Sequence, residues 1–154
     1  MDSRLFRDAM GKFATGITVI TTEYNEDISG MTVNAFMSVS LEPKLIAISI
    51  DEKASMYPKL QKTGKFGLSI LAEDQKELSM IFAKQIKKNR EIVFKMQDTV
   101  PVIEDSIVTL SCNVKETAEA GDHIIFIAEV TDIAVNEAEP VLFFGGKYRS
   151  LKSL

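Results

Sequence analysis

A polar but uncharged segment, 30–40 (GMTVNAFMSVS), is the part of the chain whose residue types best suit ligand binding. It contains Thr32, Asn34, Ser38 and Ser40 among apolar neighbours. Hydroxyls, an amide and backbone N–H groups can bind the edge of a neutral heterocycle or hold a phosphate. The alternative is a half-buried strand followed by a hydroxyl-rich turn, which needs no ligand. The residues alone leave both interpretations open.

A basic stretch, 84–90 (KQIKKNR), holds four basic residues in seven. It is either a solvated helix end or loop, or a counter-charge for an anionic ligand such as a phosphate. The whole chain has a net charge of -4. General nucleic-acid binders usually present a strongly basic face, so we expect no nucleic-acid partner.

The counts of cysteine and histidine limit the mechanisms that are available. The single cysteine, Cys112, excludes an internal disulfide framework and a cysteine-based zinc site. The single histidine, His123, excludes every mechanism that needs two. There is no dinucleotide fingerprint, no P-loop and no nucleophile elbow. We therefore expect no metal site, and any difficult chemistry would belong to an organic cofactor.

Hydrophobic periodicity predicts the elements that must position these residues. The expected helices are 4–13, 54–61 and one that begins with a capping box from Asp74 to Glu77 and contains Leu78, Ile81 and Phe82. The expected strands are 17–24, 28–33, 45–50, 66–71, 108–115, 124–130 and 141–144. The turn signal after Tyr24 makes the first two strands a hairpin. The apolar phase slips near Asp132, which predicts a bulge there.

These elements indicate a mainly β protein. The strands are not regularly interleaved with helices, so a small, mostly antiparallel β-barrel with short rim helices is favoured over a parallel sheet. A length of 154 residues, 45% of them apolar, suits one domain spanning 1–154. No apolar run approaches the roughly 20 residues of a membrane-spanning helix. With no export signal at the N-terminus, we expect no membrane association and a cytoplasmic location.

Five stretches of the chain resemble one known family and occur in that family's order: 6–22 (FRDAMGKFATGITVITT), 30–43 (GMTVNAFMSVSLEP), 78–83 (LSMIFA), 120–123 (AGDH) and 140–148 (PVLFFGGKY). The chain resembles the flavin reductase-like, FMN-binding split-barrel family, above all the reductase components of two-component phenol and 4-hydroxyphenylacetate monooxygenases. This resemblance implies a Greek-key split barrel that forms a homodimer. It also implies reduction of FAD or FMN by NADH or NADPH, with reduced flavin passing to a separate oxygenase component.

The resemblance also implies the residues of a flavin site. In the family, one segment lines the isoalloxazine ring and the ribityl chain of the flavin. The resemblance implies that this segment corresponds here to Thr32, Val33, Asn34, Ala35, Ser38 and Val39. The segment reaching the ribityl and phosphate end matches Ser49, Asp51, Lys53 and Ser55, although Lys53 is equally a solvated lysine. The block near the phosphate matches Phe82 and Ala83, and Lys84 stands where the family has glycine. Tyr148 and Phe144 match the aromatic region beside the nicotinamide, and a core role is as plausible for Phe144.

His123 matches the family's position near the nicotinamide and is the candidate catalytic residue. We do not assign it as an essential proton donor, because hydride transfer depends mainly on stacking two rings at near contact. Its imidazole can hydrogen-bond the carboxamide and orient it. Cys112 lies on the apolar side of its strand, so we interpret it as a packing residue.

Two main functions follow from the resemblance. The first is an NAD(P)H:flavin oxidoreductase that supplies an aromatic monooxygenase, and the AGDH block favours it. The alternative is a flavoredoxin-like electron carrier that holds FMN and does not turn over nicotinamide; a purely structural or sensory flavoprotein is a third option. We favour FAD over FMN because the closest resemblance is to phenol hydroxylase reductases that use FAD. The choice between NADH and NADPH stays open at this point.

Overall fold

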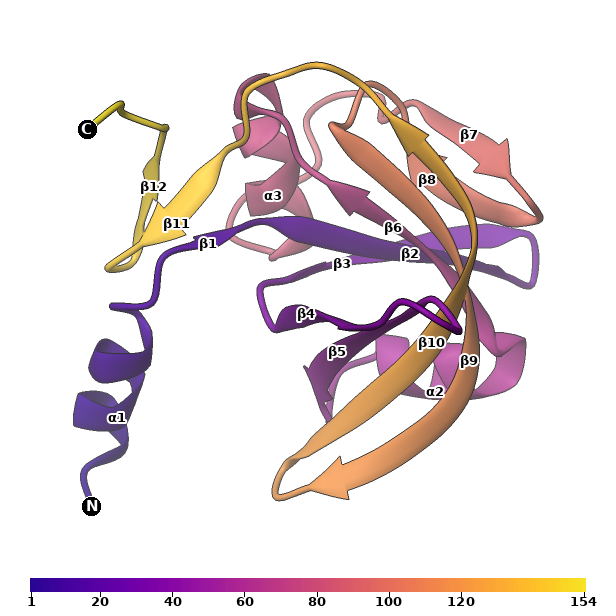
Figure 1. Ribbon diagram of the computed structural model, residues 1–154, viewed down its shortest axis with the longest axis horizontal. Coiled ribbons are helices and arrows are strands. Elements are labelled where there is room, and N and C mark those ends of the chain that lie inside the picture. The colour runs from indigo at the N-terminus through magenta and orange to yellow at the C-terminus, as the bar shows by residue number, and fades with distance from the viewer.

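A seven-stranded antiparallel sheet forms the body of the structure, a computed structural model that describes residues 1 to 154 (Figure 1). The spatial order of its strands is β3-β2-β6-β9-β10-β5-β4. The bounds are β2 Thr18–Tyr24, β3 Asp27–Val33, β4 Phe36–Ser40, β5 Leu45–Asp51, β6 Lys65–Ile70, β9 Val108–Ala120 and β10 His123–Val135. The long β9 and β10 bend strongly, which gives the sheet its curvature.

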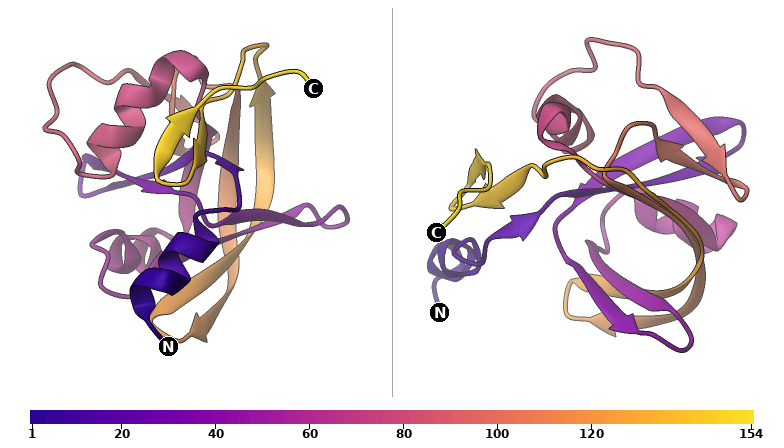
Figure 2. Two further views of the ribbon diagram at one scale, coloured as in Figure 1. Left: turned by 90° about the vertical axis from the view of Figure 1, so that its left-hand side faces the viewer. Right: turned by 45° about the horizontal axis from the view of Figure 1, so that its top comes forward.

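Two small sheets and three α-helices surround this body. One sheet has the order β1-β11-β12 and the other pairs β7 with β8. The strand bounds are β1 Thr15–Gly16, β7 Phe94–Gln97, β8 Val100–Ile103, β11 Leu142–Phe144 and β12 Lys147–Arg149. The helices are α1 Ser3–Met10, α2 Met56–Thr63 and α3 Lys76–Phe82, and a 3₁₀ turn, Glu73–Gln75, precedes α3. Helix α1 and the β11–β12 hairpin project together from one side of the sheet (Figure 2).

The protein has two hydrophobic clusters. The larger one has 14 buried residues and includes Phe66 of β6 and Phe126 of β10. The smaller one packs α3 against β2 and includes Ile17, Leu71 and Leu78. Cys112 belongs to the larger cluster, and burial raises the pKa of its thiol to about 12. The interpretation of Cys112 as a packing residue is therefore confirmed.

Several expectations from the sequence are confirmed. Strands β2 and β3 form the predicted hairpin, and its turn residues Asn25 and Glu26 have positive φ, as a two-residue type I′ turn requires. Pro58 lies in the first turn of α2, where its missing N–H costs no helical hydrogen bond. The register between β9 and β10 shifts between Val130 and Asp132, where the bulge was expected.

Other expectations were incomplete or wrong. Strands β4, β7, β8 and β12 were not predicted; they are short, and most residues of β4, β7 and β12 are not buried. The capping box from Asp74 to Glu77 does not form. Instead, the Gln75 side chain accepts the Ala72 N–H at 2.9 Å and begins the 3₁₀ turn. The side-chain amide of Gln75 performs the capping that the carboxylates were expected to perform.

The sheet is curved, but its hydrogen bonds do not close it into a barrel. Its two edge strands, β3 and β4, follow each other in the chain through the two-residue link Asn34-Ala35 and are not paired with each other. The coarse prediction of a mainly β fold with short helices is confirmed. Because β3 and β4 are not paired with each other, the link Asn34-Ala35 lies at the open edge of the sheet, and this is the feature of the fold that matters most for a binding site.

A close crossing of β8 over β6 yields a stability prediction. A Cβ atom on Gly67 would overlap the Pro101 carbonyl oxygen and lie 2.8 Å from Val102 Cγ1. We expect Gly67→Ala to lower the free energy of unfolding by about 3 kcal/mol, because backbone must move to make room. Urea denaturation followed by circular dichroism measures this. Gly16→Ala is the matched control, since nothing lies within 4 Å of its added methyl group; equal midpoints for the two variants would contradict the prediction.

Candidate functional site

Two adjacent hollows flank the link between β3 and β4. The first, which we call the Tyr148 hollow, has a volume of about 270 Å³. Its lining residues come from four separate parts of the chain: Ile17, Thr32, Asn34, Ser79, Ala83, Gln85, Phe143 and Tyr148. Four of the site residues expected from the sequence, Thr32, Asn34, Ala83 and Tyr148, therefore meet at one place. The left view of Figure 2 shows the β11–β12 hairpin beside α3, where two of the walls come together.

The end of β3 decides which side chains face this hollow. Val33 is only 4% exposed and belongs to the larger core cluster. Because side chains alternate along a strand, its neighbours Thr32 and Asn34 point to the opposite face. The Thr32 hydroxyl donates to the Ser79 carbonyl at 2.7 Å and so joins β3 to α3. The Val33 side chain is therefore part of the core and does not line the hollow, although Val33 belongs to the segment expected at the site.

The C-terminal end of α3 forms another wall through a Schellman motif. The Gln85 N–H bonds the Met80 carbonyl at 2.9 Å, and the Lys84 N–H bonds the Ile81 carbonyl at 3.0 Å. Lys84 has a φ of 59°, in the left-handed region that favours glycine. This is the position at which the resemblance to the family implied a glycine. The turn thus keeps its shape with a lysine, and the Lys84 side chain is exposed.

The aromatic wall comes from the C-terminal hairpin. The Tyr148 hydroxyl lies 3.0 Å from Ser79 Oγ and donates to Gln85 Oε1 at 3.4 Å. Its ring meets Phe143 edge to face, with the ring centroids 5.3 Å apart. Phe144 does not line the hollow: its ring lies between the cations of Lys12 and Arg149, 5.6 and 5.5 Å from its centroid. Phe143 therefore takes the place beside the site that the sequence comparison suggested for Phe144.

The second hollow, which we call the β4–β5 hollow, is almost entirely apolar. It has a volume of about 230 Å³ and is lined by Ala35, Phe36, Met37, Ala47, Ile48, Ser49 and Ile125. The Ser49 N–H donates to the Ala35 carbonyl at 3.0 Å and anchors the link to β5. The N–H groups of Asn34 and Ala35 make no hydrogen bond within the chain, and both residues are exposed. A flat apolar ligand with hydrogen-bond acceptors along one edge suits this arrangement.

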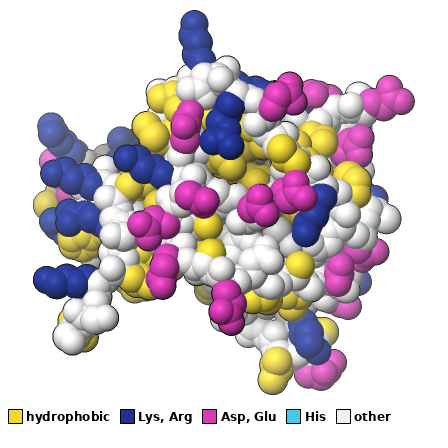
Figure 3. Space-filling view, turned by 90° about the horizontal axis from the view of Figure 1, so that it is seen from above, with side chains coloured by type: hydrophobic (Ala, Val, Ile, Leu, Met, Phe, Trp, Pro, Cys, Tyr) yellow, Lys and Arg dark blue, Asp and Glu magenta, His cyan; other side chains and the backbone are white.

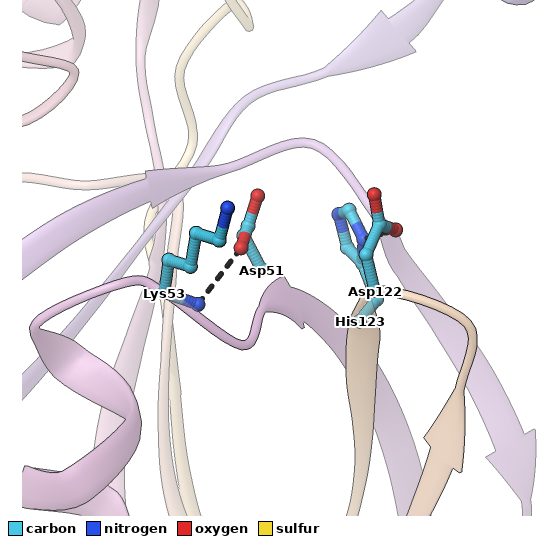
Figure 4. A network of polar contacts seen from close by, with 4 residues as sticks. All are labelled: Asp51, Lys53, Asp122 and His123. Atoms are coloured by element: carbon cyan, nitrogen blue, oxygen red, sulfur yellow. Dashed lines mark hydrogen bonds and ion pairs between the residues drawn. The ribbon is translucent and has the colours of Figure 1, made fainter.

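A group of charged side chains lies where β5 ends and β10 begins (Figure 4). His123 is directly opposite Asp51 in the β5–β10 ladder, and the Lys53 N–H donates to Asp51 Oδ1 at 2.8 Å. In Figure 4 the Lys53, Asp51, Asp122 and His123 side chains all extend in the same direction from the strand ends. The turn before β10 is held by the Glu52 N–H, which bonds the Asp122 carbonyl at 3.0 Å.

Asp122 holds the imidazole of His123 in place. Its Oδ1 lies 2.8 Å from His123 Nδ1. This hydrogen bond, and the attraction of His123 when it is charged, lower the pKa of the Asp122 carboxyl below its ordinary value. The carboxylate therefore stays ionised at neutral pH, and the contact is lost only in acid, as pH falls through the lowered pKa. With Nδ1 engaged, Nε2 of the partly exposed ring remains available to a ligand.

The remaining expected residues do not all lie at the hollows. Ser38 and Val39 are exposed on β4 and line neither of them. Lys53 is exposed, and Ser55 precedes α2 without making a capping hydrogen bond. Phe82 covers Gly30, where an added Cβ would lie 2.5 Å from its ring, so packing against β3 accounts for it.

The basic stretch is an exposed loop that follows α3. Its residues are exposed apart from the half-buried Ile86, and they form no regular secondary structure. Arg90 lines a separate hollow of about 150 Å³ with acidic neighbours that include Asp74 and Asp105. The structure favours the solvated-loop interpretation for most of this stretch.

The sequence reasoning missed four residues of the Tyr148 hollow: Ile17, Ser79, Gln85 and Phe143. Ser79 had a detectable signal, because a serine between Leu78 and Ile81 on a buried helix face needs a hydrogen-bond partner. The structure contains no group of three or more His, Cys, Asp or Glu side chains that could hold a metal ion. None of its helices is long and apolar enough to span a membrane.

Comparisons with known proteins assign this fold and site to a family. The model of the flavin reductase like domain matches residues 10–152. An NADH-dependent flavin reductase from a Rhodococcus species is 40% identical, over 96% of this chain and 86% of the relative. The reductase component of 4-hydroxyphenylacetate 3-monooxygenase from Thermus thermophilus is 33% identical, over 95% of each chain. The solved structure of the flavin reductase PheA2 in its native state superposes with a TM-score of 0.97 at 55% identity, covering 99% of this chain and 100% of that one. This chain belongs to the family of flavin reductase-like domains.

The left-handed backbone at Lys84 yields a prediction that separates strain from charge. We expect Lys84→Gly to raise the free energy of unfolding by about 1 kcal/mol, because glycine adopts this conformation without a Cβ clash. Lys84→Ala is the matched control: it removes the same charge and keeps the strained Cβ, so no comparable gain is expected. Urea midpoints measure both variants, and an equal gain in the two would show that the charge is responsible.

Proposed function

We propose that this protein is an NADH-dependent flavin reductase whose reduced flavin is used by a separate oxygenase component. The observation that carries this proposal is the convergence of Thr32, Asn34, Ala83 and Tyr148, from three distant segments, on one hollow beside two unpaired N–H groups. Family membership and the NADH-dependent Rhodococcus relative support the choice of NADH as the hydride donor. The 4-hydroxyphenylacetate relative supports the choice of an aromatic monooxygenase as the partner.

The residues present fit a flavin. Its isoalloxazine ring is flat and largely apolar, with carbonyl oxygens and a ring nitrogen along one edge that accept hydrogen bonds. The N–H groups of Asn34 and Ala35 are donors suited to that edge, and the apolar walls of the β4–β5 hollow suit the rings. Lys53 and the N-terminus of α2 beside Ser55 supply positive charge for a phosphate. We favour FAD over FMN, on the resemblance to reductases that use FAD.

When bound, the flavin accepts a hydride from NADH and so supplies the redox chemistry. The work of the chain is to bind and orient the two rings, because hydride transfer at near contact needs alignment more than acid–base help. His123, held by Asp122 at 2.8 Å, is suited to bond the nicotinamide carboxamide through Nε2. A reaction that consumes NADH also fits the cytoplasmic location expected from the sequence.

We infer further that the curved sheet is the split barrel of this family and that residues 1–154 form one domain. The unpaired edge strands β3 and β4, joined by only two residues, support the split, and the family model covers 10–152. The choice between this fold and a fully closed barrel depends on hydrogen bonds across that edge. The open edge is where the unpaired N–H groups lie, so the proposed function depends on the split.

An anaerobic titration tests the proposed function. We expect the purified protein with FAD or FMN to bleach the visible flavin absorbance when NADH is added, and NADPH to act more slowly. The same titration without protein is the control for the uncatalysed reaction. If flavin binds but neither nicotinamide bleaches it, the flavoredoxin-like electron carrier replaces the reductase.

A substitution tests the role of His123. We expect His123→Ala to raise KM for NADH about fivefold, the equivalent of one lost hydrogen bond of about 1 kcal/mol, and to leave the Kd for flavin unchanged. Asp132→Ala, at the far end of the same strand, is the control and should change neither value. A weaker flavin affinity with normal NADH kinetics would contradict the assignment of His123 to the nicotinamide.

We also propose that the protein is a homodimer. Helix α1 has no buried residue; Leu5, Phe6 and Met10 on the helix, and Phe13 just after it, are each more than half exposed. A monomer rarely exposes such a stripe to water, so we infer that a second copy of the chain covers it.

The oligomeric state tests this proposal directly. We expect light scattering to give twice the chain mass, and Phe6→Glu combined with Met10→Glu to give a monomer, because two charges cannot be buried in an apolar contact. Arg4→Glu changes the charge of the opposite helix face and should leave the dimer intact. A monomeric wild-type protein would overturn the proposal.

A further inference from the structure

Ser79 occupies an unusual position for a serine. It lies inside α3 and is only 2% exposed. Serine is a poor residue for a helix interior, because its hydroxyl competes for backbone hydrogen bonds. A buried hydroxyl also needs a partner, and here the partner is Tyr148 Oη at 3.0 Å, 69 residues further along the chain. Helix α3 therefore contains a serine at a position where serine is unfavourable, and the side chain of this serine makes one long-range hydrogen bond.

Ser79 also joins a third segment. Its carbonyl accepts the Thr32 hydroxyl at 2.7 Å in addition to the helical N–H of Ala83 at 3.0 Å. One residue thus connects the end of β3, the helix α3 and the C-terminal hairpin. These three segments supply most of the wall of the Tyr148 hollow.

The direction of the hydrogen bonds follows from counting protons. The Tyr148 hydroxyl donates its single proton to Gln85 Oε1 at 3.4 Å. The Ser79 hydroxyl therefore donates to Tyr148 Oη. Because this donation uses its only proton and the side chain is buried, Ser79 acts on the hollow through Tyr148.

The C-terminal hairpin is held by packing and by a few directional bonds. Strand β12 consists of three residues and pairs only with β11, which lies between β12 and the two-residue β1. The Tyr148 ring packs against the smaller hydrophobic cluster and Phe143, and the Lys76 ammonium lies 5.5 Å from its centroid. Hydrogen bonds depend on direction more than apolar packing does, so the bond at the hydroxyl adds a positional constraint to these ring contacts.

We propose that Ser79 is a positioning residue for cofactor binding: by holding the Tyr148 hydroxyl against α3, it sets the distance between the aromatic wall and the Thr32–Asn34 wall. This inference rests on the proposed function, since the cofactor whose affinity it affects is the flavin. The geometry points to flavin binding as the affected step, because Tyr148 shares its hollow with Thr32 and Asn34 and is not part of the group around His123.

The test is a double-mutant cycle on the intact protein with FAD as the probe. Ser79→Ala and Tyr148→Phe each remove one partner of the bond, and the Kd for FAD is measured by quenching of flavin fluorescence. We expect each variant to weaken FAD binding about three- to tenfold, the range expected for one lost hydrogen bond. The double variant should be no weaker than Tyr148→Phe alone, because Tyr148→Phe already removes the bond to Ser79 together with the bond to Gln85.

Ser111→Ala is the matched control. Ser111 is 1% exposed, and its hydroxyl donates to the Gln97 carbonyl at 2.8 Å, away from both hollows. We expect it to lower Tm about as much as Ser79→Ala and to leave the Kd for FAD unchanged. A purely structural role for Ser79 would make the two serine variants alike in both Tm and Kd.

The outcomes separate this inference from the proposed function. A wild-type protein that binds neither FAD nor FMN overturns both. A wild-type protein that binds FAD, with Ser79→Ala binding as tightly or with additive effects in the double variant, overturns the positioning role alone. If Ser79→Ala does not fold, Tyr148→Phe at the half-buried end of the bond decides the question, and an unchanged Kd there overturns the inference.

Discussion

The register of β5 between β4 and β10 is the constraint on which the rest of the site depends. In this register Asp51 is opposite His123 and Ser49 is opposite Ile125, while the Ser49 N–H also holds the carbonyl of Ala35. A slip of one residue would turn the buried Ile48 and Ile50 to the outside of the sheet, so the core enforces the register. The same packing that stabilises the sheet therefore places the β3–β4 link, the carboxylate of Asp51 and the imidazole of His123 beside one another.

A second consequence of this arrangement is that the open edge of the sheet provides free hydrogen-bond donors. Unpaired strand edges are usually a liability, because their N–H groups attract other strands. Here the link between the two edge strands is only two residues long, and the free N–H groups of Asn34 and Ala35 lie between the β4–β5 hollow and the Tyr148 hollow. An aromatic heterocycle with acceptors on its edge would satisfy these donors, which a fully closed barrel would satisfy internally.

The third wall of the site comes from segments that are attached to the sheet at few points. The end of α3 is shaped by the Schellman motif at Lys84, and the β11–β12 hairpin is joined to it through Tyr148 and Ser79. Figure 3, which looks onto the molecule from above, shows lysine and arginine side chains gathered on its left-hand side, although the chain as a whole is acidic.

The sequence by itself determined the elements with strong local patterns and the family. The β2–β3 hairpin follows from a run of β-branched residues, 17–22, and the turn signal at Asn25; the bulge near Asp132 follows from a phase slip. The exposed β4 and the hairpin of β7 and β8 escaped prediction, because β4 is a short edge strand that is mostly exposed and Pro101 interrupts the apolar residues of β8. Only the tertiary structure decided that Thr32 and not Val33 faces the site, that Phe143 and not Phe144 lines it, and that Ser79 joins its walls. These are properties of contacts between segments that are distant in the chain, such as Ser79 and Tyr148, which are 69 residues apart, and no local pattern contains them.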